Sequence, residues 1–296
     1  MVSDSKDLLV AWYGDDFTGA AAVMEVLAFA GLPSMLFLAP PTKSQLARYD
    51  NLRAIGVAST ARALTPDGMD RTLPAVFKSL LDLDPQILHY KVCSTLDSSP
   101  QVGSIGRAIE IAADLTQPTA VPVLIAAPQM RRYQLFGHLF AGHGNATYRL
   151  DRHPVMSRHP VTPMTESDVG RHIALQSDRI DASNWPEQEL AKTPDENRIS
   201  LSSVDSHDAT TETAAGQMIW ENRKANRFAV GSQGVEYALV RHWIDTGVLS
   251  EQEQPKSAGR ATGMVAVSGS VSTTTADQIA WSRANGFTTI RFDATQ

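Results

Sequence analysis

The sequence lacks the features that mark secreted, membrane-spanning and nucleic-acid-binding proteins. Its single cysteine, Cys93, excludes an internal disulfide and a cysteine-rich zinc motif and is typical of the reducing cytoplasm. No apolar run approaches the roughly 20 residues of a membrane-spanning helix, and the first residues, MVSDSKD, do not resemble a signal peptide. With 26 Lys and Arg against 32 Asp and Glu, the net charge of -6 provides no broad basic surface for nucleic acid or anionic lipid. We therefore expect a cytoplasmic protein without a membrane or nucleic-acid partner.

The composition and the order of the patterns are those of a globular α/β protein. The chain has 296 residues, 43% hydrophobic and 20% charged, which is enough for one large domain or two. Apolar runs predict strands at Leu8–Tyr13, Ser34–Leu38, Arg53–Ala58, Ile87–Val92, Val121–Ala126, Ile199–Val204 and Phe228–Val230. Helical patterns lie between them at Thr18–Phe29, Met69–Leu81, Ile105–Leu115 and Glu212–Ala225, and Pro74 is expected to kink or shorten the second helix. This alternation predicts a parallel sheet whose ligands bind at the carboxyl ends of its strands.

Two segments depart from this pattern. Over residues 133–150 the alternation of strands and helices is replaced by two strand-like segments around the turn residues Gly142–Asn145. This pattern predicts an antiparallel hairpin inserted on the parallel core. Residues 246–262 are mostly polar with Pro and Gly, and they predict a linker between a first domain, residues 1–245, and a second unit, residues 263–296.

The second unit is short. Its patterns predict strands at Met264–Val267 and Thr288–Phe292 around a helix at Thr274–Asn285. One strand-helix-strand unit cannot bury its own apolar faces, so we expect these residues to begin a second α/β domain. The loop SGSVST before the helix offers hydroxyl and N–H donors for a phosphate, although it has no P-loop lysine.

Two carboxylates follow the first predicted strand. Asp15 and Asp16 stand at its end, and Thr18 and Gly19 open the next helix. Small residues at a helix start let an anion approach free N–H groups, and a neighbouring carboxylate can act as a base or help to hold a metal. The alternative is that one aspartate only caps the helix, and the residues alone leave both interpretations open.

A second polar cluster, KVCSTLDSSP, follows the strand at 87–92, and its lysine, hydroxyls and carboxylate suit a polyol or an acid. Cys93 is a weak candidate for a nucleophile because no base is identified beside it, and a small residue at a strand end explains it equally well. The four histidines between residues 138 and 159 form no HExxH motif or Cys/His pair, so we assign no metal-ligating residue.

Five motifs together resemble the four-carbon acid sugar kinase family. They are DDFTGA, KVCSTLDSSP with VGSIG after it, GHLF, HPVTPMTESD and VAVSGSVSTTTADQIA, and they occur in the family's order over nearly the whole chain. Members of this family transfer the γ-phosphate of ATP to the terminal hydroxyl of acids such as threonate, erythronate or 3-oxo-tetronate. The resemblance implies a small anionic sugar acid as substrate, ATP and Mg²⁺ as cofactors, an N-terminal domain for the acid and a C-terminal domain for the nucleotide.

The resemblance also implies roles for individual residues. Asp16 or Asp15 would be the base for the attacking hydroxyl, while Thr18 and Gly19 would bind the anionic end of the acid. The other residues implied to bind the substrate are Lys91, Ser94, Thr95, Asp97, Arg132, His159, Thr162 and Met164. Those implied to bind the nucleotide are Ser232, Ser268, Gly269, Ser270 and Ser272.

Family members continue well past the position of Gln296, so we expect a C-terminal truncation that removes most of the nucleotide domain. Exposed apolar faces on the remaining part predict association, for example as a homodimer. The leading interpretation is a sugar-acid kinase, and the alternative is a non-catalytic sugar-acid-binding protein. A hydrolase has neither a located triad nor a G-x-S-x-G elbow.

Overall fold

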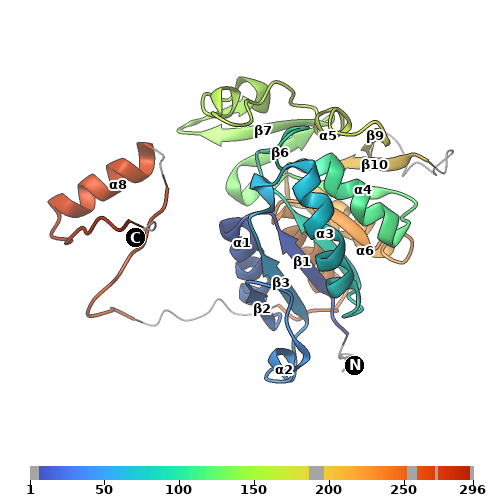
Figure 1. The fold of residues 1–296 in the computed structure, drawn as a ribbon, viewed down its shortest axis with the longest axis horizontal. Coiled ribbons are helices and arrows are strands. Elements are labelled where there is room, and N and C mark those ends of the chain that lie inside the picture. The colour runs from blue at the N-terminus through green and yellow to red at the C-terminus, as the bar shows by residue number, and fades with distance from the viewer. Residues whose placement is uncertain (1–6, 187–196, 252–258, 271–272, 294–296) are drawn as a thin grey trace. The chain divides into compact units, whose positions relative to one another are not determined.

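The chain divides into two units of very different size, Met1–Gln254 and Pro255–Gln296. The computed structural model describes residues 7–186, 197–251, 259–270 and 273–293 (Figure 1). The first unit contains both sheets, and the second contains one helix.

An eight-stranded parallel sheet forms the centre of the first unit (Figure 1). Its strands are β1 (Val10–Gly14), β2 (Ser34–Phe37), β3 (Ala54–Ala58), β4 (Ile87–Lys91), β5 (Val121–Leu124), β9 (Ile180–Trp185), β10 (Ile199–Val204) and β11 (Phe228–Gly231). They follow the order β2-β3-β1-β4-β11-β5-β10-β9, so β11, the last strand among the described residues, lies between β4 and β5. The predicted α/β fold with a parallel sheet is confirmed. The edge strand β9 was not predicted, because its sequence IDASNW has no apolar run.

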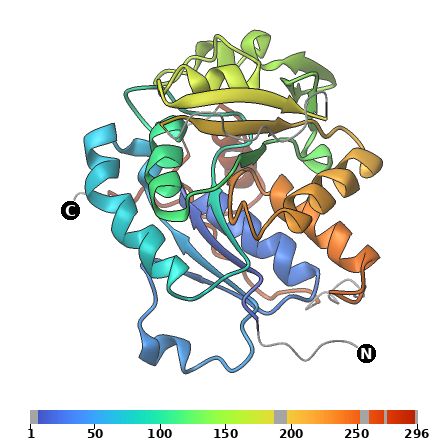
Figure 2. The ribbon, with the colours of Figure 1, turned by 90° about the vertical axis from the view of Figure 1, so that its right-hand side faces the viewer.

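Helices cover both faces of this sheet (Figure 2). One face packs against α3 (Pro66–Leu81), α4 (Ile105–Thr116) and α5 (Val169–Ala174), and the other packs against α1 (Phe17–Phe29), α6 (Ala209–Glu221) and α7 (Gly234–Asp245). Strand β1 is buried on both sides, because Ala11 and Tyr13 join the first core and Val10 and Trp12 the second. A short helix, α2 (Lys43–Leu46), follows β2. None of the helices in the described residues is long and apolar enough to cross a membrane.

Helix α3 corrects one expectation from the sequence. It begins at Pro66 after the capping residue Thr65 and continues through Pro74 to Leu81, so Pro74 does not shorten it. The apolar stripe of Met69, Leu73, Phe77 and Leu80 is fully buried on both sides of the proline. This packing outweighs the loss of one backbone hydrogen bond at Pro74.

A three-stranded antiparallel sheet is inserted after β5, as predicted (Figure 1). It consists of β6 (Arg132–Leu135), β7 (His138–His143) and β8 (Ala146–Arg149). The turn between β6 and β7 holds Phe136 and Gly137 at φ of 51° and 76°. Asp205, which follows β10, accepts hydrogen bonds from both of their N–H groups at 2.6 and 3.0 Å. The turn is thereby tied to the carboxyl end of the parallel sheet.

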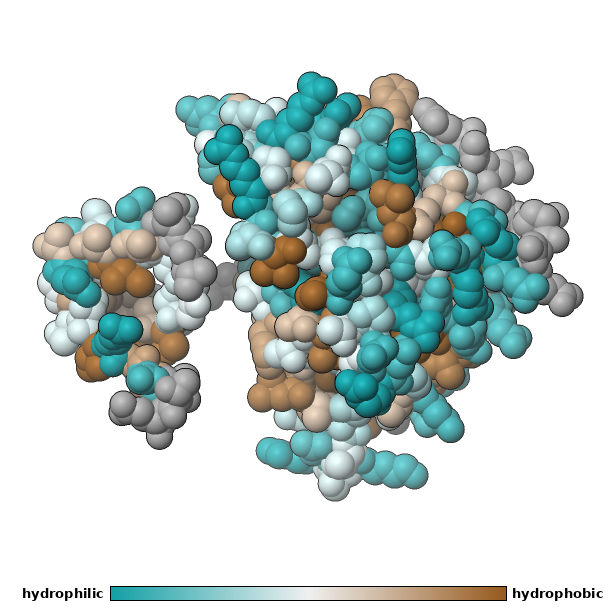
Figure 3. All heavy atoms as spheres, turned by 45° about the horizontal axis from the view of Figure 1, so that its top comes forward, coloured by the Kyte–Doolittle hydropathy of each residue, from teal (hydrophilic) through white to brown (hydrophobic). Residues whose placement is uncertain are grey.

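In the second unit, the described residues form one helix, α8 (Thr273–Ala284), close to the predicted bounds. The strands predicted at Met264–Val267 and Thr288–Phe292 are not formed, and this prediction was wrong. A strand needs a neighbour for its backbone hydrogen bonds, and no such ladder occurs in the described residues of this unit. Hydrophobic side chains remain on its surface (Figure 3), with Val265 91% and Ile290 86% exposed.

A buried polar pair joins the centre of the sheet to helix α7. His89 on β4 and Glu236 on α7 are both fully buried, with His89 Nδ1 2.6 Å from Glu236 Oε1. His89 Nε2 lies 3.1 Å from the carbonyl oxygen of Gly231, so this nitrogen must carry a hydrogen and donate it. Glu236 Oε2 is buried without a hydrogen-bond partner in the described residues. The pair therefore depends on a single side-chain contact.

Replacing Glu236 with Leu should lower the free energy of unfolding by about 3 kcal/mol, because one buried ring nitrogen of His89 would lose its partner. The double variant His89→Leu with Glu236→Leu should recover most of this loss, since an apolar pair needs no compensating charge. Urea denaturation of both variants and the wild type checks this. A double variant no more stable than the single one would contradict it.

Candidate functional site

The candidate site lies where β1 and β4 end side by side. Gly14 pairs with Lys91 in the parallel ladder, and the N–H of Asp15 donates to the Lys91 carbonyl oxygen at 2.9 Å. The chain leaves β1 toward α1 on one face of the sheet and leaves β4 toward α4 on the other face. Open α/β sheets bind ligands in the crevice that such a divergence creates. The two polar segments predicted from the sequence meet here.

Arg62 connects the carboxylates of this site. It lies in a single 3₁₀ turn, Ala61–Ala63, that follows the carboxyl end of β3. Its guanidinium donates two hydrogen bonds to Asp15, from Nε to Oδ2 at 3.0 Å and from Nη2 to Oδ1 at 2.6 Å. The same Nη2 is 3.1 Å from Asp16 Oδ1, and Nη1 is 3.9 Å from Asp97 Oδ2. Arg62 was not identified from the sequence, where its only signal is its place after a strand.

Asp15 and Arg62 form an ion pair in which the carboxylate is buried. The Asp15 side chain is 3% exposed, and that burial raises the pKa of its carboxyl, while the hydrogen bond and charge of Arg62 oppose the rise. Burial acts to lower the pKa of Arg62, but the hydrogen bond and charge of Asp15 outweigh it and hold that pKa above its ordinary value. Asp15 therefore serves chiefly as the counter-charge of Arg62.

Asp16 caps helix α1, which is one of the two interpretations that the sequence left open. It is the N-cap of α1, where Oδ1 accepts a hydrogen bond from the Gly19 N–H at 2.9 Å. Its side chain is nevertheless 31% exposed, and Oδ2 has no hydrogen bond to any described residue. One oxygen thus holds the helix start, and the other is free to accept a proton or a hydrogen bond.

Lys91 fills the space beside Gly19. The lysine is 2% exposed, and its ammonium donates to the Val92 carbonyl oxygen at 2.7 Å. A Cβ atom on Gly19 would lie 2.6 Å from Lys91 Nζ and 2.4 Å from Asp16 Oδ1, so a larger residue here would displace one of these two charged groups. Because the Gly19 N–H is already bonded to Asp16, it is not a free donor for an anion. Thr18 is exposed.

The loop that contains Asp97 meets the segment around residue 160. Thr162 Oγ1 donates to Asp97 Oδ1, and His159 Nδ1 lies 2.9 Å from Thr162 Oγ1 and 3.7 Å from Asp97. The structure therefore brings these three predicted residues together. Met164 is 1% exposed and packs in the main core.

Two of the remaining predicted substrate residues lie beside Cys93, and the third begins the inserted sheet. Thr95 Oγ1 lies 3.1 Å from Cys93 Sγ, and Ser94 is partly exposed. Arg132 is the first residue of β6, and its Nη1 donates to the carbonyl oxygens of Met130 and Arg131 at 3.1 and 3.2 Å.

The predicted nucleotide residues belong to both units, and Ser232 directly follows Gly231, the residue that pairs with Lys91 in the sheet. Ser232 is fully buried, and its hydroxyl donates to the Ile125 carbonyl oxygen at 2.8 Å and accepts from the Gly234 N–H at 2.9 Å. Ser268, Gly269 and Ser270 are exposed residues of the second unit. Ser272 lies outside the described residues.

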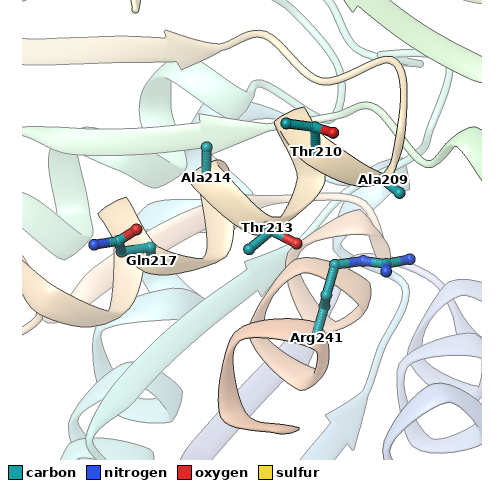
Figure 4. Close-up of a pocket in the computed structure, with 6 residues that line it drawn as sticks. All are labelled: Ala209, Thr210, Thr213, Ala214, Gln217 and Arg241. Atoms are coloured by element: carbon teal, nitrogen blue, oxygen red, sulfur yellow. The ribbon is translucent and has the colours of Figure 1, made fainter. Parts of the chain in front are cut away.

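A shallow hollow of about 400 Å³ lies on the outer surface of α6 and α7 (Figure 4). It is lined by Ala209, Thr210, Thr213, Ala214, Gln217 and Arg241. Its one charged group, Arg241, already donates to Glu212 at 2.8 Å, and the hollow contains no residue predicted from the sequence. We therefore assign the function to the sheet edge. No group of three His, Cys, Asp or Glu that could hold a metal occurs in the described ranges.

A histidine fixes the polar loop after β4 to helix α5. His172 Nε2 lies 2.9 Å from Ser98 Oγ, and Gln176 Nε2 donates to the same hydroxyl at 3.0 Å. The Ser98 hydroxyl in turn donates to the Leu96 carbonyl oxygen at 2.9 Å. Burial lowers the pKa of His172 to about 4, so it is neutral near pH 7.

Comparison with known proteins identifies the family. Residues 10–239 match the family model described as a sugar-binding N-terminal domain. The chain belongs to this family. The chain is 44% identical over 296 residues to 3-oxo-isoapionate kinase of Paraburkholderia graminis, a match that covers 97% of this chain and 62% of that protein. It is 26% identical over 287 residues to 3-oxo-tetronate kinase of Salmonella typhimurium, which covers 93% of this chain and 64% of that one.

These matches confirm the resemblance of the sugar-binding domain to the four-carbon acid sugar kinase family. The chain spans less than two thirds of the length of these two relatives. A crystal structure from Salmonella typhimurium LT2 has the same fold, with a TM-score of 0.71 at 24% identity over 94% of this chain and 64% of that one.

Replacing Arg62 with Gln should lower the free energy of unfolding of the sugar-binding domain by about 2–3 kcal/mol, because Asp15 would remain buried without its counter-charge. The control is Arg179→Gln, which breaks an exposed pair with Asp114 and should cost less than about 1 kcal/mol. Chemical denaturation near pH 7 measures both. Equal losses would show that Asp15 does not depend on Arg62.

His172 should make stability depend on pH. Its folded pKa of about 4 lies below the ordinary 6.5, so its contribution is complete above pH 6.5 and is lost as the pH falls through that range toward 4, by roughly 3 kcal/mol. His172→Gln should flatten this part of the profile relative to the wild type. Parallel slopes in denaturation curves of the two proteins would contradict the assignment.

Proposed function

We propose that this chain forms the sugar-acid site of an ATP-dependent kinase that phosphorylates the terminal hydroxyl of a 3-oxo-tetronate, threonate or erythronate type of acid. The observation that carries the proposal is the partly exposed carboxylate of Asp16, whose Oδ2 is free, at the crevice between β1 and β4. The names of relatives, 3-oxo-isoapionate kinase and 3-oxo-tetronate kinase, support the reaction class and a small sugar acid as substrate.

The residues of the site would have different roles in such a reaction. Phosphoryl transfer depends mainly on positioning and on neutralisation of charge, with a base that accepts the proton of the attacking hydroxyl. Asp16 Oδ2 is the acceptor in this proposal, and Arg62 orients its carboxylate through the contact at 3.1 Å. Asp15 is too buried and too fully paired with Arg62 to take that role. The hydroxyls of Ser94 and Thr95 are suited to bind hydroxyl groups of the acid.

ATP with Mg²⁺ is the phosphate donor implied by a kinase, and it would supply the γ-phosphoryl group with its charge neutralised. The hydroxyls of Ser268 and Ser270 have the right donor chemistry, but both residues are exposed and the space around Gly269 is open. The proposal for this chain therefore rests on the acid site. We also propose that residues 263–296 begin a nucleotide-binding domain after the linker at 246–262. Pairing of chains as a homodimer stays a prediction.

Asp16→Asn should reduce kcat for phosphorylation by at least about 100-fold, because the amide cannot accept the proton. Stability should change by less than about 1 kcal/mol, since Asn caps a helix as well as Asp does. The measurement is ADP release by the full-length protein with threonate, erythronate and 3-oxo-isoapionate, together with an unfolding curve.

The matched control is Asp208→Asn, the same change at the exposed N-cap of α6, which should leave kcat unaltered. Full turnover by Asp16→Asn would exclude Asp16 as the base. Binding of the acids by the wild type without any ADP release would favour the non-catalytic sugar-acid-binding alternative.

A further inference from the structure

Ser98, in the loop after β4, is held by two side chains from helix α5 and the residues just after it. Its hydroxyl donates to the Leu96 carbonyl oxygen at 2.9 Å, so its one hydrogen is used. His172 Nε2 at 2.9 Å and Gln176 Nε2 at 3.0 Å contact the same hydroxyl oxygen, and both therefore act as donors. Gln176 Oε1 accepts from the Gly106 N–H at 3.2 Å, which fixes the orientation of the amide. We call the side chains of Ser98, His172 and Gln176 the α5 clamp.

The backbone at Leu96 explains why this loop needs support. Leu96 has a φ of 53°, in the left-handed region that a leucine rarely adopts. Its side chain is fully buried in the main core, and its N–H closes a turn onto the Cys93 carbonyl oxygen at 3.0 Å. Such a conformation persists only where the surroundings hold it. The hydrogen bond from Ser98 to the Leu96 carbonyl oxygen supplies part of that support.

Asp97 is the residue between these two anchored positions. The Leu96 side chain is held by the core, and the Ser98 hydroxyl is held by the clamp. The Asp97 carboxylate itself accepts from Thr162 Oγ1 and lies 3.9 Å from Arg62 Nη1. The direction of this carboxylate is therefore set by the backbone on both sides of it, and the α5 clamp fixes that backbone.

Helix α5 is a firm support for the clamp. Its N-cap, Asp168, accepts from the Arg171 N–H at 2.8 Å, and the Val169 N–H donates to the Gly137 carbonyl oxygen in the turn of the inserted sheet at 2.9 Å. Val169 and Ile173 are fully buried in the main core. The helix is thus fixed to the inserted sheet and to the core, so the loop cannot move away from it without losing the contacts of the clamp.

We propose that Ser98, His172 and Gln176 are positioning residues of the acid site, which hold Leu96 in its left-handed conformation and thereby aim the carboxylate of Asp97 at the sugar acid. This inference rests on the proposed function and deepens it. Asp97 contributes to affinity in the orientation that the clamp imposes. A change in the clamp should therefore weaken binding of the acid through Asp97.

Hydrogen exchange of the Leu96 amide, followed by NMR, tests the clamp without any substrate. In Ser98→Ala, exchange at Leu96 should become about tenfold faster than in the wild type, as expected for the loss of hydrogen bonds that hold the loop. The amide of Leu88 in β4, which donates to the Arg227 carbonyl oxygen at 2.8 Å, is the internal reference for global unfolding. An equal acceleration at Leu96 and Leu88, or none at either, would overturn the inference.

Steady-state kinetics of the full-length protein tests the action through Asp97. With the acid that the wild type phosphorylates best, Ser98→Ala should raise KM for the acid about tenfold and change kcat by less than about threefold, because binding of the acid is what is lost. Asp97→Asn should raise the same KM. In the double variant, KM should lie within about twofold of that of Asp97→Asn alone, since residues that act through one another are not additive. A further tenfold rise would contradict positioning through Asp97.

His172 offers a conservative rescue, and Ser177 offers a matched control. His172→Leu removes the donor and should reproduce both effects of Ser98→Ala, whereas His172→Gln keeps a donor and should recover most of each. Ser177→Ala makes the same change just after α5, where the hydroxyl donates to Glu110, and should leave exchange and KM within about twofold of the wild type. Equal losses in the two His172 variants would count against the clamp. Circular dichroism checks folding, and the His172 variants carry the test if Ser98→Ala does not fold.

The outcomes separate this inference from the proposed function. No ADP release by the wild type with threonate, erythronate or 3-oxo-isoapionate would overturn the proposed function and, with it, the role of the clamp in binding the acid. ADP release with an unchanged KM in Ser98→Ala and His172→Leu would overturn the inference and leave the sugar-acid site standing. Faster exchange at Leu96, together with a rise in KM that disappears in the Asp97→Asn background, would support it.

Discussion

The carboxylate of Asp15 is the constraint on which the site depends. It follows β1, which pairs with β3 on one side and with β4 on the other. Its side chain is 3% exposed, and a charge so deeply buried needs a partner. Arg62 supplies that partner from the end of the neighbouring strand β3 and reaches Asp16 and Asp97 with the same guanidinium. The ends of β1 and β3 and the loop after β4 are thereby joined through one side chain. Only a sheet that places these strands side by side permits this.

The inserted antiparallel sheet is held at the carboxyl end of the parallel sheet. Its first strand begins at Arg132, and its turn is fastened to Asp205 after β10 through two backbone hydrogen bonds. The segment that follows brings His159 and Thr162 onto Asp97. The inserted sheet and the segment after it are therefore both held to polar groups that follow strands of the parallel sheet.

Much of this arrangement follows from the sequence by simple rules. Alternating apolar runs and helical patterns predict a parallel sheet, and such a sheet gathers the residues after its strands, here Asp15, Asp16 and Lys91, at one edge. Arg62 could not be predicted in this way, because its role comes from a pairing across strands and no local motif marks it. Strand β9 has a polar sequence and depends on its ladder with β10. The strands expected near Val265 and Ile290 do not form, because their apolar runs have no neighbouring strand to pair with in the described residues.

The place of β11 has a consequence for how the protein is made. It is the last strand of this sheet along the chain, yet it pairs with β4 and β5 in the middle of the sheet, where Phe228 lies beside Leu88. During synthesis, β4 and β5 therefore keep unpaired edges until residues 228–231 have left the ribosome. Such edges can pair with other chains, and contacts between distant residues form slowly. The nascent chain is consequently most exposed to aggregation just before its central strand arrives, and this is the interval in which a chaperone would matter most.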